Sequence, residues 1–232
     1  MSSSPSPAPD VTLRPALVTR AVGGFGASIG GGAALGAAAW LSDQLPWPAS
    51  LLIPANAIGV WLAVAFLLGG SARTIPTGAL RGLIALLSAV AVYYLLFAVL
   101  GSGIRVVGAS HAATVWGLVA LVAGPVMGGA GAVWRHGTGW PRATGVALLS
   151  AALIGEGLVF GGSRFLHLDQ LQQDPGTLLF AAEIIVGLLL PVVLLRRGER
   201  LRGYVATLGL AVVAGIAIGP VTALIRGIAD RF

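Results

Sequence analysis

The stretch "GALRGLIALLSAVAVYYLLFAVL", residues 78–100, decides the fold class of this chain. Arg81 is its one charged residue, and the other positions are apolar, small or weakly polar. A helix needs about 20 such residues to cross the hydrocarbon of a bilayer, so this stretch is long enough. Similar blocks recur along the 232 residues, of which 56% are hydrophobic and 9% charged, with a mean hydropathy of +0.92. Soluble domains carry about 25% charged residues, so lipid surrounds most of this chain.

The apolar blocks predict an all-α, polytopic transmembrane bundle of seven spans. Six is the alternative, because the first block is glycine-rich and only mildly apolar. Barrel strands would alternate apolar and polar residues over about 10 positions, whereas these blocks are longer and apolar all round. A Ser/Pro-rich tail, residues 1–17, is expected to be disordered before a single membrane domain, residues 18–232. The predicted spans are Ala21–Leu41, Leu51–Gly70, Gly78–Leu100, Ala112–Val133, Gly145–Ser163, Leu178–Leu195 and Tyr204–Leu224.

Arginine predicts the orientation of the bundle. The net charge is +6 and there is no lysine. With a cytoplasmic N-terminus, ten arginines fall in inner segments and four in outer ones, as the positive-inside rule requires. The charges lie between apolar blocks rather than on one wettable face, which argues against nucleic-acid binding. Arginine without lysine, with abundant alanine and glycine, also suggests a GC-rich bacterial genome, and hence the bacterial cytoplasmic membrane.

Pairs of glycines four residues apart indicate where helices approach closely. This spacing lets two backbones come together in a membrane, either within one chain or across a homodimer. Both interpretations stay open at this point. The pairs are Gly26 and Gly30, Gly32 and Gly36, Gly124 and Gly128, and Gly215 and Gly219.

A few polar side chains interrupt the predicted spans, and with a cytoplasmic N-terminus they fall in the outer half: Glu156, Glu183, Asn56, Tyr93 and Tyr94. An acid at the centre of a membrane helix costs about 2.5–3.5 kcal/mol and normally faces the bundle interior or a wet cavity. We therefore hypothesise an outward-facing pocket centred on the two glutamates, which would accept a proton, a cation or a cationic solute. Asn56 and one tyrosine would form its wall, because neighbouring helical residues point about 100° apart. The alternative is that the glutamates hydrogen-bond to adjacent helices and lock their packing.

Three quoted stretches resemble a known family. They are "ANAIGVWLAVAFLLGG" at 55–70, the third span quoted above and "LIGEGLVF" at 153–160. Together they are similar to an uncharacterised family of small actinobacterial multi-pass membrane proteins, a domain of unknown function. The similarity includes an Asn before the second helix, a Trp followed by Ala-Phe, paired tyrosines and a Glu-Gly pair, and it runs from about Gly24 to Leu195. The resemblance implies a membrane protein and names no substrate.

Residues for catalysis, metal or cofactor binding are not suggested by the sequence. His111, His136 and His167 fall in different predicted loops and lack metal-ligand spacing. There is no HExxH, GxSxG, Walker or dinucleotide-binding motif. We therefore expect a non-enzymatic bilayer protein, with a small-solute or ion transporter, or an accessory of one, as the leading interpretation. A non-transporting scaffold that assembles through its glycine faces is the alternative, and a membrane-embedded enzyme is third.

Overall fold

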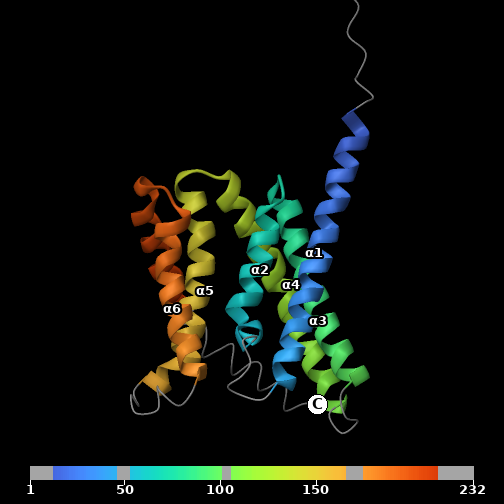
Figure 1. Cartoon of the computed structure of the whole chain (residues 1–232). Coiled ribbons are helices and arrows are strands. Elements are labelled where there is room, and N and C mark those ends of the chain that lie inside the picture. The colour runs from blue at the N-terminus through green and yellow to red at the C-terminus, as the bar shows by residue number, and fades with distance from the viewer. Residues whose placement is uncertain (1–12, 46–52, 101–105, 166–174, 214–232) are drawn as a thin grey trace, which may run out of the picture.

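The computed structural model describes residues 13–45, 53–100, 106–165 and 175–213, and in these residues all regular structure is helical (Figure 1). The helices form one bundle, in which α2 lies between the α1–α3–α4 group and the α5–α6 pair. A last helix is described over 200–213. The elements are α1 (Leu13–Gln44), the 3-10 turn η1 (Ile53–Asn56), α2 (Ile58–Gly70), α3 (Ile75–Leu100), α4 (Val106–His136), α5 (Gly139–Phe165), α6 (Pro175–Leu194) and the 3-10 turn η4 (Arg197–Glu199).

Most helices extend beyond the predicted spans, because an apolar pattern records only the part of a helix that lies in hydrocarbon. The helix α1 begins at Leu13, inside the stretch predicted as a disordered tail; residues 1–12 of that tail lie outside the described residues. The described residues contain four helices that are long and apolar enough to cross a membrane, and two shorter apolar ones. The seventh predicted span is described only as far as residue 213. Seven spans and a cytoplasmic N-terminus stay predictions.

The second predicted span differs most from the structure. A continuous helix over Leu51–Gly70 was expected, but α2 begins at Ile58 and is 13 residues long. The turn η1, which contains Pro54, precedes it, and Ala57 at the N-cap has an extended backbone. Proline lacks an amide N–H and disfavours a helical residue before it, which favours a break of the helix at Pro54. The start of a helix therefore lies within an apolar segment.

Glycines hold the central helices together, as the four-residue spacing indicated. A Cβ on Gly128 of α4 would collide with the backbone of Gly78 and Gly82 of α3, and one on Gly69 of α2 would collide with Gly128 itself. Gly32 and Gly36 of α1 meet the backbone at Ala85 and Ala89 in the same way. These pairs therefore serve packing within the chain. Gly26 and Gly30 face open space, and Gly215 and Gly219 lie outside the described residues.

The surface of the bundle is apolar, as expected of helices in contact with lipid. Large aliphatic side chains are widely exposed there: Val122 is 69% exposed, Val193 72% and Leu201 75%. The buried core is built mainly from small residues, with Ala65, Ala85 and many glycines among them. A soluble protein rarely leaves so much apolar surface uncovered, so the fold is that of a membrane protein.

Candidate functional site

The five polar residues singled out in the sequence lie around one structural feature, the start of α2. Asn56 lies two residues before the start of α2, and Tyr93 and Tyr94 lie in the second half of α3. Glu156 lies on α5 and Glu183 on α6. They form two separate clusters, which we call the carboxylate pair (Glu156 and Glu183) and the aromatic cavity (lined by Asp43, Asn56, Trp61, Tyr93, Tyr94 and Trp116, together with apolar residues of α2, α3 and α4).

Glu156 acts as the N-cap of a helix that lacks one of its own. The first amides of any helix have no partner inside it, and leaving them bare in lipid is costly. Ala57 cannot supply an acceptor, and the first turn of α2 contains no acid. The Glu156 carboxylate accepts a hydrogen bond of 2.8 Å from the Ile58 amide on Oε1, and one from the Gly59 amide on Oε2. The positive end of the helix dipole favours an anion at this place. Glu156 on α5 therefore forms hydrogen bonds to a neighbouring helix, α2.

Glu183 has no such partner. It is 5% exposed, and neither carboxylate oxygen has a hydrogen-bond partner among the described residues. Its Oε1 lies 3.5 Å from the position that a Cβ of Gly59 would take, and Oε2 of Glu156 lies 3.1 Å from the same point. The two carboxylates therefore converge on Gly59, where the absence of a side chain leaves them room.

Few other charges lie near the carboxylate pair. The sequence of α2 contains no ionisable residue, and Glu183 is the single one in α6. The ionisable residues of α5 are Arg142, Glu156 and Arg164. Arg142 contacts the far end of α6 through the Leu194 carbonyl, and the side chain of Arg164 lies outside the described part of the structure. No described cation therefore offsets the second carboxylate, and a buried ion without a partner is strongly unfavourable.

Asp43, in the last turn of α1, organises the second cluster. Its Oδ1 accepts a 2.6 Å hydrogen bond from Nδ2 of Asn56, and its Oδ2 accepts one of 2.5 Å from the Tyr93 hydroxyl. These contacts join α1, the turn before α2, and α3. Asp43 lies beyond Leu41, where the first predicted span ends, and the structure extends that helix to include it.

The aromatic cavity has a volume of about 320 Å³. Both Tyr93 and Tyr94 line it, whereas one of them was expected to point away. Their rings meet edge to face, with centroids 4.9 Å apart, so two side chains that leave the helix in different directions still border one space. Glu156 and Glu183 are not among the residues that line the cavity. The connection between the two clusters is Ile58, which lines the cavity and donates its amide proton to Glu156.

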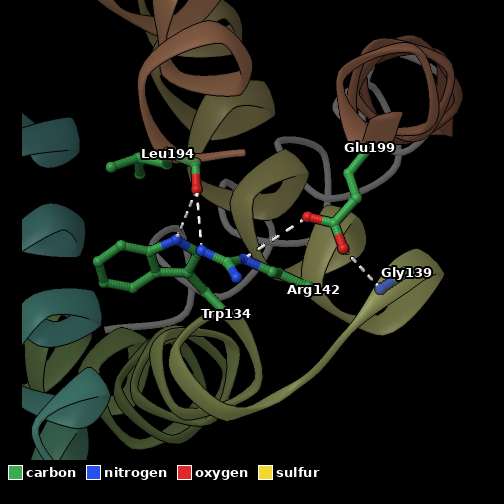
Figure 2. Close-up of polar contacts among 5 residues, drawn as sticks. All are labelled: Trp134, Gly139, Arg142, Leu194 and Glu199. Carbon is green, nitrogen blue, oxygen red and sulfur yellow. Dashed lines mark hydrogen bonds and ion pairs between the residues drawn. The ribbon is translucent and has the colours of Figure 1, made fainter. Parts of the chain in front are cut away.

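A different polar network closes the other end of the bundle (Figure 2). The carbonyl of Leu194 at the end of α6 accepts hydrogen bonds from Nε1 of Trp134 and Nη2 of Arg142, at 3.2 and 3.3 Å. Glu199 accepts a 2.7 Å bond from the Gly139 amide and lies 3.8 Å from Nε of Arg142. Gly139 has φ +62°, a conformation that favours glycine. These contacts join α4, α5 and α6 at the end of the bundle that is away from the start of α2.

The histidines do not form a site in the described structure. His136 contacts the Ala72 carbonyl at 2.7 Å, and His167 lies outside the described residues. Within the described ranges no group of three potential metal ligands occurs. The sequence interpretation missed two contributions. Backbone amides at the start of α2 bind Glu156, and Trp61 and Trp116 line the aromatic cavity. The run of Pro54, Asn56 and Gly59 inside an apolar block was the signal for a broken helix.

Comparison with known proteins identifies the family and no activity. No curated protein and no solved structure matches the chain at a significant level. A family model described as a "Family of unknown function (DUF6518)" matches residues 15–227. The match confirms the resemblance to a domain of unknown function and extends it beyond Gly24–Leu195 at both ends. The chain therefore belongs to this family of unknown function.

Proposed function

We propose that this protein is a proton-coupled carrier of a small solute, in which the carboxylate pair holds the coupling proton. One observation supports this most directly: Glu183 is buried without a partner beside a second carboxylate that is already engaged. Two ionised carboxylates at this place would repel each other without compensation. A proton on Glu183 removes the unpaired charge. Intramembrane acids of this kind are typical of proton pathways.

The start of α2 provides a physical connection between proton and solute. Ile58 belongs to both clusters, since its amide bonds to Glu156 and its side chain lines the aromatic cavity. A change in the charge of the carboxylate pair therefore acts on the same turn of backbone that borders the cavity. Broken helices whose ends lie inside the membrane are a recurring feature of secondary transporters.

The membrane arrangement that goes with this function keeps the orientation inferred from arginine. We propose seven spans, a cytoplasmic N-terminus and a location in the bacterial cytoplasmic membrane. The carboxylate pair and the aromatic cavity would then lie in the outer half, and the Leu194–Arg142–Glu199 network at the cytoplasmic end. Fusing a cytoplasm-active and a periplasm-active reporter in turn after residues 137 and 170 tests the orientation. Position 137 should report the cytoplasm and position 170 the outside, and the reverse assignment would refute it.

The decisive experiment measures proton movement in proteoliposomes. The full chain is reconstituted with a pH-sensitive dye inside, a membrane potential is imposed, and inorganic and small organic cations are added outside one at a time. We expect solute-dependent proton movement that is lost in Glu183→Gln, because glutamine resembles a permanently protonated acid. Glu199→Gln is the matched control, since it makes the same change at the opposite end. Proton movement that is identical in wild type and Glu183→Gln would refute the proposal.

A scaffold function is the second candidate, and one observation favours it. The positions of a Cβ on Gly23, Gly26 and Gly30 of α1 have no heavy atom within 4 Å, so this face of α1 is unpacked in the single chain. A second copy of the chain could pack there. Gly26→Leu with Gly30→Leu would then abolish a dimer detected by cross-linking in membranes, while Glu183→Gln would leave it intact. The carrier proposal predicts that Glu183→Gln abolishes proton movement and that the two glycine substitutions leave it intact.

A further inference from the structure

The aromatic cavity lies on the opposite side of the α2 start from the carboxylate pair, and its walls combine one acid with four aromatic side chains. Asp43 contributes the acid, and the rings are those of Trp61, Tyr93, Tyr94 and Trp116. The remaining lining is largely aliphatic, with Leu86, Val90 and Ala120 among it. Such a lining is suited to a ligand with one charged group and an apolar body.

The charge of Asp43 favours a cation in the cavity. Asp43 accepts hydrogen bonds from two neutral donors, Asn56 and Tyr93, so its negative charge is oriented but not neutralised by them. It also lies in the last turn of α1, which contains no basic residue and where the helix dipole is negative. An acid at that end of a helix is unfavourable alone and becomes favourable when a positive charge lies beside it.

Three of the four rings are held by contacts within the protein. Nε1 of Trp61 donates a 2.6 Å hydrogen bond to the Ala55 carbonyl, and the Tyr93 hydroxyl is bonded to Asp43. Tyr93 supports Tyr94 edge to face. Aromatic faces attract alkylammonium groups through the ring quadrupole, and cages of several rings are a recurring way to bind them. A bare metal ion would instead need several oxygen ligands, which this mostly apolar wall does not offer.

We propose that the aromatic cavity binds a small organic ammonium ion, with the cationic head beside Asp43 and its alkyl groups against Trp61, Tyr94 and Trp116. The volume of about 320 Å³ is at the lower end for ligand pockets, which limits the ligand to a few carbon atoms around the nitrogen. That this ion is also the transported solute rests on the proposed function, whereas its binding does not.

The test compares two probes of the same shape and different charge. Choline and its neutral carbon isostere, 3,3-dimethylbutan-1-ol, are titrated into the full chain in lipid nanodiscs, with calorimetry and tryptophan fluorescence as readouts. We expect choline to bind at least about tenfold more tightly than the isostere, because Asp43 and the rings recognise the charge. Equal affinity for the two probes, or no binding of choline, would overturn the proposal without any variant.

Variants then assign the binding to the cavity. Asp43→Asn keeps one acceptor oxygen, which can serve Asn56, while its NH₂ group can donate to the Tyr93 hydroxyl. It should weaken choline about tenfold while leaving the isostere unchanged. Trp116→Leu should weaken choline several-fold, and Trp116→Phe, which keeps a ring, should restore most of the loss. Choline affinity that is unchanged in a folded Asp43→Asn protein would contradict the assignment.

The outcomes separate this inference from the carrier proposal. Glu199→Gln should keep choline binding, because Glu199 lies at the opposite end of the bundle and does not line the cavity. If choline binds as described but proton movement does not depend on Glu183, the cavity assignment stands and the carrier mechanism fails. If Glu183 controls proton movement and choline does not bind, the carrier stands and this inference fails.

Discussion

The carboxylate of Glu156 on α5 accepts a 2.8 Å hydrogen bond from the amide of Ile58, 98 residues earlier in the chain. This contact explains how α2 can begin inside an apolar segment without a capping side chain of its own. It also joins the two clusters at that end of the bundle, because Ile58 borders the aromatic cavity. Stability and ligand binding should therefore respond differently to the two glutamates.

The first prediction contrasts Glu156→Gln with Glu183→Gln. Glutamine has one acceptor oxygen, so one of the two amides capped by Glu156 would lose its partner and meet an NH₂ group instead. We expect Glu156→Gln to lower the free energy of unfolding by about 1–3 kcal/mol. Glu183→Gln breaks no hydrogen bond of the described structure and should leave stability unchanged or higher. Denaturant unfolding of both proteins in detergent measures the difference, and equal losses would contradict it.

Gly59→Ala tests the space into which the two carboxylates converge. The new methyl group would meet the Leu153 side chain and come within 3.1 Å of Oε2 of Glu156. Overpacking of this kind costs about 1–3 kcal/mol. The control is Gly155→Ala on α5, where nothing lies within 4 Å. Thermal unfolding should show a loss for Gly59→Ala alone. A Gly59→Ala protein as stable as the control would mean that the packing around α2 is looser than the structure indicates.

Gly128→Ala tests the three-helix contact of α2, α3 and α4. A Cβ there would collide with the backbone of Gly78, which cannot rotate away as a side chain can. We expect a loss of about 1–3 kcal/mol or more in unfolding free energy. Gly117→Ala on the same helix has open space at this position and should gain a few tenths of a kcal/mol from helix propensity, up to about 1 kcal/mol. The opposite order of stabilities would exclude the close approach of α3 and α4.

Tyr93→Phe tests the link between α1 and α3. The ring remains, but Asp43 loses its hydroxyl donor. We expect a loss of about 1 kcal/mol in stability and weaker choline binding, because Asp43 is no longer held toward the cavity. Combined with Asp43→Asn in a double-mutant cycle, the two effects should be less than additive. Strict additivity of the two changes would show that the residues act independently.

The lipid environment could be inferred from the amino-acid sequence, because the chain has few charged residues and long apolar blocks. The blocks must be helices, because unpaired backbone groups are too costly in hydrocarbon. The approximate positions of five helices followed from the same pattern, as did close helix approach at Gly32, Gly36, Gly124 and Gly128, although not that this approach is within one chain. That Glu156 needs an inward-facing partner was also foreseeable from the cost of an acid in lipid.

The broken start of α2, the separation of Glu156 and Glu183 from Tyr93 and Tyr94, and the central position of Asp43 could not be inferred in this way. Helices that are apolar on every side carry no periodic signal of which face turns toward which neighbour. An unpaired amide at a helix start can be bonded by a side chain far away in the chain. The two groups meet only when the helices pack, so the sequence does not show which acceptor it will be. For this reason chemical composition determines the helical membrane class, and three-dimensional packing determines where its few polar groups meet.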